Sequence, residues 1–368
     1  MKVLHFFKTY YPDTFGGIEQ VIFQICEGAH SYGVESSVLT VTDGKPGVRS
    51  VAGHNVVALK KNFELLSTPF SLSAISKLSQ LSREVDVVHY HYPWPFMDVA
   101  HLLGGVKAKS VVTYHSDVVK QKFAMRLYAP LMNQFLSCVD SIVATSPNYL
   151  RSSPVLKRFA GKTEIIPIGL DVNTYPVVKE SILSSWKAKF PGPFFLFVGV
   201  LRYYKGLDTL LEACLQVPYP VLIVGDGPEG DRLRQLAMRK KLQNVHFLGA
   251  LPDHDKVALL HLCHALVFPS HLRSEAFGIS LLEAAMYGKP MISCEIGTGT
   301  TYINRHDETG LAISPGSPVE LATAMHQLMK NPIESERMGE RARERYQALF
   351  TADEMVKKYV ALYGRLMG

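Results

Sequence analysis

The chain has 368 residues, of which 47% are hydrophobic and 20% charged, and its net charge is +6. At about 150 residues per domain this length suggests two domains, and the composition excludes intrinsic disorder. Five scattered cysteines without a CxxC spacing argue against a zinc ribbon and a disulfide framework. The start of the chain reads as a strand rather than a signal peptide, and no apolar run reaches the roughly 18 residues of a membrane-spanning helix. We therefore expect a cytoplasmic protein.

The first half alternates short apolar runs with helical patterns. Residues 17–32 carry apolar side chains at intervals of three and four, as one face of a helix does. Runs typical of strands cover 3–7, 35–41, 86–91, 110–115, 141–145 and 164–167. This alternation indicates βαβ units and a parallel sheet with helices on both faces.

The pattern weakens between Gly169 and Gly192 and then restarts, so we place a domain boundary there. Further strands are predicted at 194–199, 221–225, 245–248, 265–268 and 290–294. The tail from Ser317 is predicted to be helical. Two consecutive Rossmann-like halves imply a cleft between them, with ligands at the carboxyl ends of strands.

The strongest local signal is a pair of glutamates eight residues apart, Glu275 and Glu283. Gly278 between them permits close backbone approach, and the helix that follows offers free N–H groups to an anion. We place Glu275 in the loop and Glu283 about two turns into the helix. A sugar nucleotide needs carboxylates that accept hydrogen bonds from its hydroxyls at both ends and N–H donors for its phosphates in between, and this segment offers both. The alternative is solvated helix-end charges, but Glu283 lies among apolar residues, where an unpaired charge is costly.

A second signal is Arg202 with Lys205, two cations between a predicted strand and a predicted helix. This placement directs both toward the cleft, where a pyrophosphate would need neutralising. Either cation alone is typical of an ordinary surface charge, and the pair gains weight because it complements the glutamates. The run GDGP at 225–228 reads as a tight turn or as a nucleotide-facing loop.

Weaker signals lie in the first half. Gly16 and Gly17 open a helix after the first strand, but without a GxGxxG pattern. They serve close approach to a phosphate or sugar, or form a simple tight turn. His115 follows a strand and would point into the cleft, although a lone histidine is more often structural.

Two patterns resemble metal sites. His89 and His91 share one face of a strand, but no third ligand is evident, so we prefer acceptor-pocket lining or core packing. The run DHD at 253–255 resembles a DxD motif, yet a helix cap and first-turn acid explain it more simply. We assign no metal site.

Together these motifs resemble the retaining glycosyltransferases of family four, which have the GT-B fold. The glutamate pair, the two cations, Gly16-Gly17, His115, the turn at 225–228 and a PIGLD hinge at 167–171 all fall in family order. The resemblance covers essentially the whole chain. The opening FFKTYYPD at 6–13 and the run EIGTGTT at 295–301 are similar to the mannosyl- and rhamnosyltransferases of bacterial lipopolysaccharide O-chains. The second run departs from the more common Gly-Gly-x-x-Glu arrangement.

The resemblance implies an α/β fold class in which two Rossmann-like domains face each other across a cleft. It implies an N-terminal acceptor-side domain at 1–175 and a nucleotide-sugar-binding domain at 176–348. A helix at 349–368 would return to the first domain.

The resemblance also implies roles for the site residues. His115 would contact the donor sugar near the reacting carbon, while Arg202 and Lys205 would bind the pyrophosphate. Glu275 would hold donor-sugar hydroxyls, and Glu283 would hold the ribose. The catalytic set is therefore His115, Arg202, Lys205 and Glu275. The donor-binding set is Gly16, Gly17, Arg202, Lys205, Glu275, Phe277, Gly278, Ile279 and Glu283.

The implied reaction is retaining, metal-independent transfer of a hexose from a nucleotide sugar, with mannose or D-rhamnose from a GDP-sugar as our interpretation. The acceptor is a lipid-linked or oligosaccharide glycan in lipopolysaccharide O-chain synthesis, and no cofactor is expected. Because no carboxylate nucleophile stands out, we favour a front-face, oxocarbenium-like route. A nucleotide-sugar epimerase or hydrolase on the same scaffold is the alternative. A non-catalytic sugar-nucleotide-binding regulator is disfavoured, because both glutamates and both cations are retained.

A basic cluster adds a further partner. Its cations are Lys107, Lys109, Lys120, Lys122 and Arg126. They lie beside apolar helix positions within 107–135, a combination that suits the surface of an anionic membrane, where a polyprenyl-diphosphate-linked acceptor would present its sugar. The alternative has Leu127, Leu131 and Phe135 facing the domain's own core. We expect a peripheral position on the inner face of the cytoplasmic membrane and no nucleic-acid partner.

Overall fold

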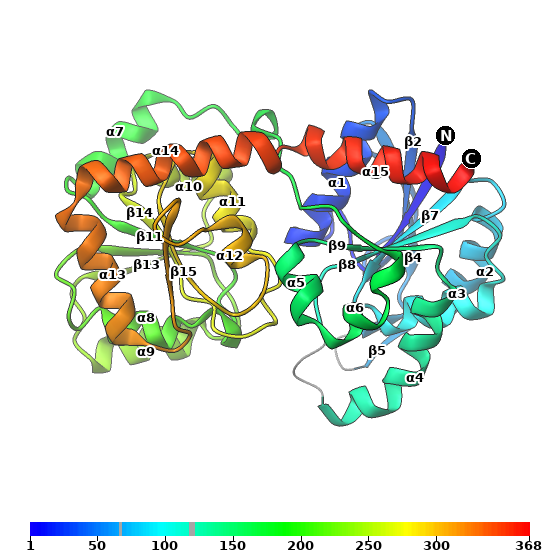
Figure 1. Cartoon of the computed structure of the whole chain (residues 1–368), viewed down its shortest axis with the longest axis horizontal. Coiled ribbons are helices and arrows are strands. Elements are labelled where there is room, and N and C mark those ends of the chain that lie inside the picture. Colours follow the sequence, from blue (N-terminus) through cyan, green and yellow to red (C-terminus); the bar gives the residue numbers. More distant parts are fainter. Residues whose placement is uncertain (66–67, 118–121) are drawn as a thin grey trace. The chain divides into compact units, whose positions relative to one another are not determined.

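The computed structural model describes residues 1–65, 68–117 and 122–368, with the backbone alone at 122–126. The chain forms two compact α/β units (Figure 1). The first unit comprises Met1–Gly169 and Thr351–Gly368, and the second comprises Leu170–Phe350. The sequence analysis placed the corresponding boundaries after 175 and 348.

The first unit is built on an eight-stranded sheet in the order β10-β9-β8-β7-β1-β2-β4-β3. Neighbouring strands are parallel except β3 and β4. The strands are β1 (Lys2–Phe6), β2 (Glu35–Thr42), β3 (Gly47–Val51), β4 (His54–Lys60), β7 (Val87–Tyr92), β8 (Lys109–Tyr114), β9 (Ser141–Ala144) and β10 (Thr163–Ile165), with β5 (Phe63–Leu65) and β6 (Thr68–Phe70) as a separate antiparallel pair. The sequence analysis missed β3 to β6. Strands β3, β5 and β6 are short and partly exposed and lack a continuous apolar run, whereas β4 has an apolar run at 56–59 that was overlooked.

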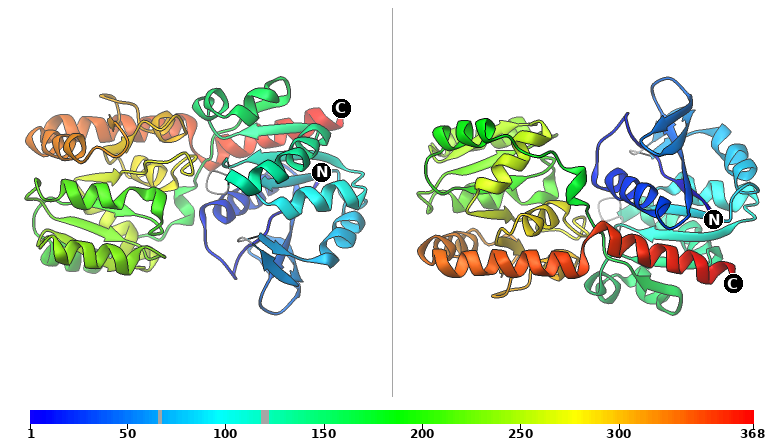
Figure 2. Two further views of the ribbon diagram at one scale, coloured as in Figure 1. Left: turned by 90° about the horizontal axis from the view of Figure 1, so that it is seen from below. Right: turned by 90° about the horizontal axis from the view of Figure 1, so that it is seen from above.

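Helices cover this sheet. They are α1 (Gly17–His30), α2 (Leu72–Leu81), α3 (Pro95–Gly104), α4 (Lys122–Cys138), α5 (Pro147–Ser152), α6 (Pro154–Arg158), η1 (Ala160–Lys162) and α15 (Ala352–Met367). The C-terminal helix α15 returns to this unit as predicted and packs along α1 (Figure 2). Gly28 of α1 permits this contact, because a Cβ there would lie 2.7 Å from Val356 Cγ2. Among the described residues, none of the helices has the length and apolar composition that a membrane span requires.

The second unit contains a six-stranded parallel sheet in the order β13-β12-β11-β14-β15-β16. Its strands are β11 (Phe195–Val198), β12 (Val221–Val224), β13 (Val245–Gly249), β14 (Ala265–Phe268), β15 (Met291–Cys294) and β16 (Gly310–Ile313). The strand order reverses between β11 and β14, which is where open α/β sheets bind ligands, at the carboxyl ends of the strands. The predicted α/β class with two Rossmann-like sheets is confirmed.

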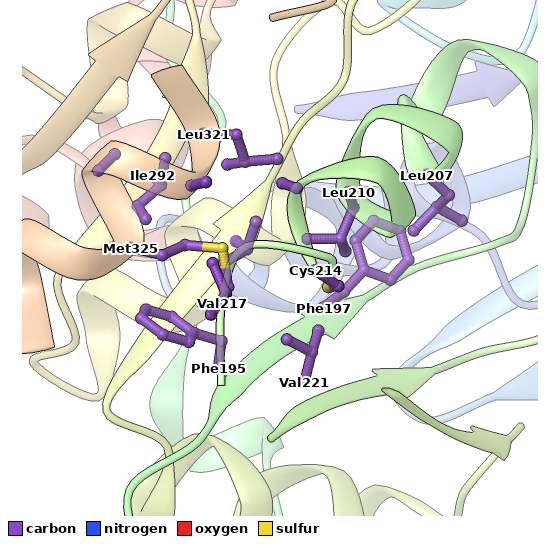
Figure 3. Close-up of a cluster of buried hydrophobic side chains, with 14 of the residues drawn as sticks. Phe195, Phe197, Leu207, Leu210, Cys214, Val217, Val221, Ile292, Leu321 and Met325 are labelled. Atoms are coloured by element: carbon purple, nitrogen blue, oxygen red, sulfur yellow. The ribbon is translucent and has the colours of Figure 1, made fainter. Parts of the chain in front are cut away.

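The core of the second unit supports this edge. Its helices are α7 (Glu180–Lys189), α8 (Leu207–Ala213), α9 (Gly230–Arg239), α10 (Asp253–Leu262), α11 (Ile279–Met286), α12 (Thr300–Ile303), α13 (Pro318–Lys330) and α14 (Pro332–Leu349), with short turns η2 (Val172–Thr174) and η3 (Tyr203–Lys205). Figure 3 shows Phe195 and Phe197 of β11 packed with Leu210 of α8 and Met325 of α13. Each fully buried side chain of this kind contributes about 1.5–3 kcal/mol. The loops after the strands therefore rest on a rigid base.

Candidate active site

Loops that follow three strands of the second unit meet at the carboxyl edge of its sheet. A Cβ at Gly206 would lie 2.0 Å from the carbonyl oxygen of Pro269, and one at Gly225 would lie 2.0 Å from that of Gly199. Gly206 also has a φ of +69°, in the left-handed region that favours glycine. Glycine at these positions brings the segments after β11, β12 and β14 into direct contact.

Lys205 and Glu275 form a buried ion pair between two of these loops. Lys205 Nζ lies 2.5 Å from Glu275 Oε2, and each side chain is 11% exposed. Ser270 Oγ donates a hydrogen bond to the same oxygen at 3.1 Å, and Lys205 Nζ lies 4.7 Å from the centre of the Phe268 ring. No described residue donates a hydrogen bond to Glu275 Oε1. One carboxylate oxygen is therefore held in place while the other is available to a ligand.

Arg202 precedes Lys205 by one turn of η3. Its side chain is exposed and makes no ion pair or hydrogen bond with the described part of the chain. The loop after β11 thus presents one cation that is already paired and one that is available to an anion.

Glu283 has a separate set of partners. Its Oε1 accepts hydrogen bonds from Tyr175 Oη at 3.1 Å and from Lys256 Nζ at 3.0 Å. Burial alone would lower the pKa of Lys256, but the carboxylates of Glu283 and Asp253 outweigh burial and raise that pKa above its ordinary value. No hydrogen bond from the described residues reaches Glu283 Oε2. Each glutamate of the pair therefore keeps one oxygen open.

The sequence analysis placed Glu283 too far into its helix. Helix α11 begins at Ile279, so Glu283 lies about one turn in rather than two. Gly278 is the residue before the helix and has a φ of +102°, so the chain turns sharply there. The N–H groups of Ile279 and Ser280 have no partner within the helix, which makes this end attractive to an anion.

Phe277 supports this turn rather than facing solvent. It is 4% exposed, and a Cβ at Gly299 would lie 2.4 Å from its Cδ2. The Gly299 N–H donates a hydrogen bond to the Ala276 carbonyl at 2.7 Å, and Arg273 Nη1 donates one to the Gly297 carbonyl at 3.2 Å. The departure from the usual family pattern at 295–301 thus lies against the segment that carries Glu275.

The predicted glycines of the first unit lie at an ordered helix entry. Gly16 precedes α1 in an extended conformation, and both Gly16 and Gly17 are exposed. Glu19, which the sequence analysis did not single out, is buried and orders the preceding loop. Its Oε1 accepts hydrogen bonds from Thr9 Oγ1 and Thr14 Oγ1, each at 2.9 Å.

His115 directly follows β8 and is only 6% exposed. Its Nε2 lies 3.1 Å from Nδ1 of His91, and burial lowers the pKa of His115 to about 3. The third histidine that the sequence did not reveal is His5 of β1: one ring nitrogen each from His5, His89 and His91 lie within 4.8 Å of one another. Five of the six ring nitrogens of this group already have hydrogen-bond partners, an arrangement typical of core packing.

The DHD run at 253–255 lies in the first turn of α10, although the residue before the helix is Pro252 rather than an acid. Asp255 Oδ1 accepts a hydrogen bond from Trp186 Nε1 at 2.8 Å, and Asp253 pairs with Lys256 at 3.1 Å. Both acids therefore have structural partners.

The structure brings most of the predicted donor-binding residues to one edge of the second unit. Arg202, Lys205, Glu275, Phe277, Gly278, Ile279 and Glu283 belong to it, while Gly16, Gly17 and His115 belong to the first unit. Lys256, Tyr175 and Ser270 were missed. Lys256 stands next to the DHD run, but nothing in its local sequence indicates that it reaches Glu283 of α11.

Comparisons with known proteins match both halves of the chain. Residues 15–174 match the family described as Glycosyltransferase Family 4, and residues 179–345 match Glycosyl transferases group 1. The chain is 54% identical over 353 residues to D-rhamnosyltransferase WbpZ of Pseudomonas aeruginosa, covering 96% of this chain and 93% of that protein. It is 48% identical to O-antigen chain mannosyltransferase C of Escherichia coli over 368 residues, covering 100% and 99%.

A solved structure shares the fold. Sucrose-phosphate synthase of Thermosynechococcus elongatus superposes with a TM-score of 0.80 at 22% identity, covering 99% of this chain and 98% of that one. The resemblance drawn from the motifs is confirmed, and the relatives give no support to an epimerase or a hydrolase.

Proposed function

The chain belongs to the glycosyltransferases of group 1 and family 4, and from this premise we propose that it transfers mannose or D-rhamnose from a GDP-linked donor. The acceptor is a polyprenyl-diphosphate-linked glycan in lipopolysaccharide O-chain synthesis. The choice of sugar rests on the two relatives, which are named as a D-rhamnosyltransferase and an O-antigen chain mannosyltransferase.

The observation that carries the proposal is the Lys205–Glu275 pair beside the start of α11. Arg202, Lys205 and the first N–H groups of the helix supply positive charge for the donor diphosphate. The open oxygen of Glu275 accepts hydrogen bonds from sugar hydroxyls, and the open oxygen of Glu283 accepts them from the ribose. Positive charges that are fixed in place before the reaction stabilise the negative charge that develops on the diphosphate as it leaves.

The reaction proceeds on one face of the sugar and retains configuration. The bond between C1 and the diphosphate oxygen breaks, and the electron pair leaves with the diphosphate. The acceptor hydroxyl oxygen then bonds to C1 on the same face and loses its proton to the leaving diphosphate. Glu275 Oε2 is held by Lys205 and Ser270, which suits a carboxylate that orients the sugar better than one that attacks it.

A donor panel tests this function. The full chain is incubated with GDP-mannose, GDP-D-rhamnose, UDP-glucose or UDP-galactose and a synthetic polyprenyl-diphosphate glycan, and products are identified by mass spectrometry. We expect transfer from a GDP-sugar, which Glu275→Gln abolishes. Glu336→Gln, a change at an exposed position of α14, serves as the matched control. Transfer from a UDP-sugar alone would contradict the donor assignment, and an epimerised sugar formed without acceptor would contradict the reaction class.

We also propose that the basic segment at 107–135 meets an anionic membrane surface. Lys107 and Lys109 are exposed, and Leu127 of α4 is 76% exposed. Of the three residues that the alternative placed in the core, Phe135 is buried and Leu127 is not; Met132 is buried as well. Lys120 lies outside the described residues, as do the side chains of Lys122 and Arg126.

Vesicle sedimentation tests the membrane proposal. Binding to anionic vesicles should fall with salt and when Lys120, Lys122 and Arg126 are changed to Ser, because each cation near such a surface contributes about 1 kcal/mol. Equal recovery with neutral and anionic vesicles would contradict membrane docking without affecting the transferase assignment.

A further inference from the structure

We propose that His5 and His91 are positioning residues, which act through a directional hydrogen-bond chain to hold His115 with its ring proton on Nδ1. The inference rests on the proposed transfer function and on the contact between His115 and the donor sugar that the family resemblance implies. It adds that His115 acts there as a neutral hydrogen-bond donor rather than as a base.

The histidines of this hydrogen-bond chain share one face of the first unit's sheet. Strands β1, β7 and β8 are neighbours, with His5 opposite His89 and His91 opposite Thr113. Side chains two residues apart along a strand point to the same face, so His115 continues the row at the end of β8. His5, His89, His91 and Thr113 are completely buried. A core face that could have been apolar therefore carries a polar row that ends at His115.

Two hydrogen bonds join the rings of His5, His91 and His115, and both must run in the same direction. His5 Nδ1 lies 3.0 Å from His91 Nε2, and His91 Nδ1 lies 3.1 Å from His115 Nε2. Burial lowers the pKa of His91 and of both its neighbours, so the rings are neutral and each carries one N–H. If His91 donates from Nδ1, then His115 Nε2 accepts and the His115 proton lies on Nδ1. If His91 donates from Nε2, all three protons shift to the Nε2 atoms. The three tautomers are thus linked.

His5 Nε2, at the far end of the hydrogen-bond chain from His115, selects between these two tautomeric states. His5 Nε2 is buried and has no hydrogen-bond partner in the described structure. In one state this atom is a bare lone pair, and in the other it is an N–H donor with no acceptor. Orphaned buried N–H groups are rarer than unsatisfied acceptors. The favoured state therefore has its protons on the Nδ1 atoms, and His115 Nδ1 makes no hydrogen bond with the described residues. As far as residues 1–65, 68–117 and 122–368 show, this N–H is available to donate to a ligand.

A second branch of the same polar row provides an internal control. His89 Nδ1 lies 2.7 Å from Tyr363 Oη, and His89 Nε2 lies 2.7 Å from Thr113 Oγ1, which in turn lies 2.8 Å from Tyr359 Oη. Both tyrosines belong to α15. His89 is as buried as His91 and lies two residues away on the same strand, yet its hydrogen bonds lead to the C-terminal helix and not to His115.

Nuclear magnetic resonance of the full chain labelled with ¹⁵N-histidine tests the inference without an activity assay. The ring ¹⁵N shifts separate a protonated from an unprotonated nitrogen, and the His115 signals are identified by their loss in His115→Gln. We expect the Nδ1–H tautomer in the wild type. His91→Asn should preserve it, because the amide N–H takes the place of His91 Nδ1–H. His91→Leu should release it, and His89→Leu should leave it unchanged.

Several outcomes would overturn the inference. One is an Nε2–H tautomer of wild-type His115, a result that stands even if His91→Leu does not fold. Another is an unchanged His115 spectrum in folded His91→Leu. A third is stoichiometric metal in the purified protein that is lost in His5→Leu, since the ring nitrogens would then be ligands.

Turnover supplies a second readout that a purely structural role would not reproduce. In His91→Leu, kcat should fall on the order of tenfold while the donor KM stays the same, the effect of one hydrogen bond made in the transition state. His91→Asn should restore most of the rate. Equal losses in His91→Leu and His89→Leu would contradict a specific role. Absence of transfer in the wild type would refute the proposed function but leave the tautomer result intact.

Discussion

Replacing either partner of the Lys205–Glu275 pair should destabilise the second unit as well as reduce transfer. A Glu275 carboxylate that acted on the sugar alone could be replaced without loss of stability. The structure gives one of its oxygens a buried partner, with Lys205 Nζ at 2.5 Å. Lys205→Met leaves a buried carboxylate without its cation, and Glu275→Gln leaves a buried ammonium without its anion.

The size of the effect follows from the burial of the pair. Removing one partner of a buried ion pair costs about 3–5 kcal/mol. Both side chains keep 11% exposure, so we take the lower end, about 3 kcal/mol. For a unit of this size each kcal/mol lowers Tm by about 2–4 °C, which gives about 6–12 °C for each single variant. The double variant Lys205→Met/Glu275→Gln removes both charges, and a coupling of about 2 kcal/mol should limit its cost to about 4 kcal/mol instead of the sum of about 6 kcal/mol.

Calorimetry and urea unfolding of the four proteins measure this coupling, and initial rates with the GDP-sugar measure transfer. All three variants should lose transfer, and the double variant should lose less stability than the two single variants lose in sum. Additive effects in the double variant would refute the reasoning, because they would mean that the pair carries no interaction energy.

Three further changes have definite expected outcomes. Arg202→Ala should lower turnover roughly 100- to 1,000-fold without a change in Tm, because the side chain is exposed and unpaired among the described residues; initial rates and melting curves check this. Gly206→Ala should cost more than about 2 kcal/mol in urea unfolding, because its Cβ would meet the Pro269 carbonyl at a φ of +69°. The first unit should lose stability as pH falls from about 6.5 toward 3. The folded pKa values of His5 and His115 are lowered by burial to about 3, while the unfolded rings bind protons below about 6.5. Each ring costs about 1.4 kcal/mol per pH unit in this window, so melting at pH 7.5 and pH 5.5 should differ, and equal Tm values would contradict it.

The sequence predicted the parts of the fold that leave a continuous apolar run. The strand Phe195–Val198 is buried at every position, as strands of a parallel sheet covered on both faces are. The strand Gly310–Ile313 was missed, although it has three buried positions, because it begins with a glycine and is only four residues long. Short strands of this kind are recognised from their neighbours in the sheet, which the sequence does not display.

The site residues themselves could likewise be predicted from the sequence more readily than the residues that contact them. The eight-residue spacing of Glu275 and Glu283 is a local feature, so it can be read from the chain. Lys256 reaches Glu283 from another helix, and His5 joins His91 from a strand 86 residues earlier. Such contacts depend on the order of strands and on helix packing. The spacing of His89 and His91 therefore suggested a pair, whereas the sheet builds a larger group.

The two glutamates illustrate why a binding site of this kind is only partly satisfied. A buried carboxylate without partners would take up a proton, because burial disfavours its charge. A carboxylate with both oxygens paired would stay charged but would have nothing left to offer a ligand. Glu275 and Glu283 each receive a lysine and a hydroxyl on one oxygen and keep the other open. Gly278 turns the chain between them, so each glutamate draws its lysine from a different element. The spacing of the motif thus provides two charged acceptors that do not compete for one cation.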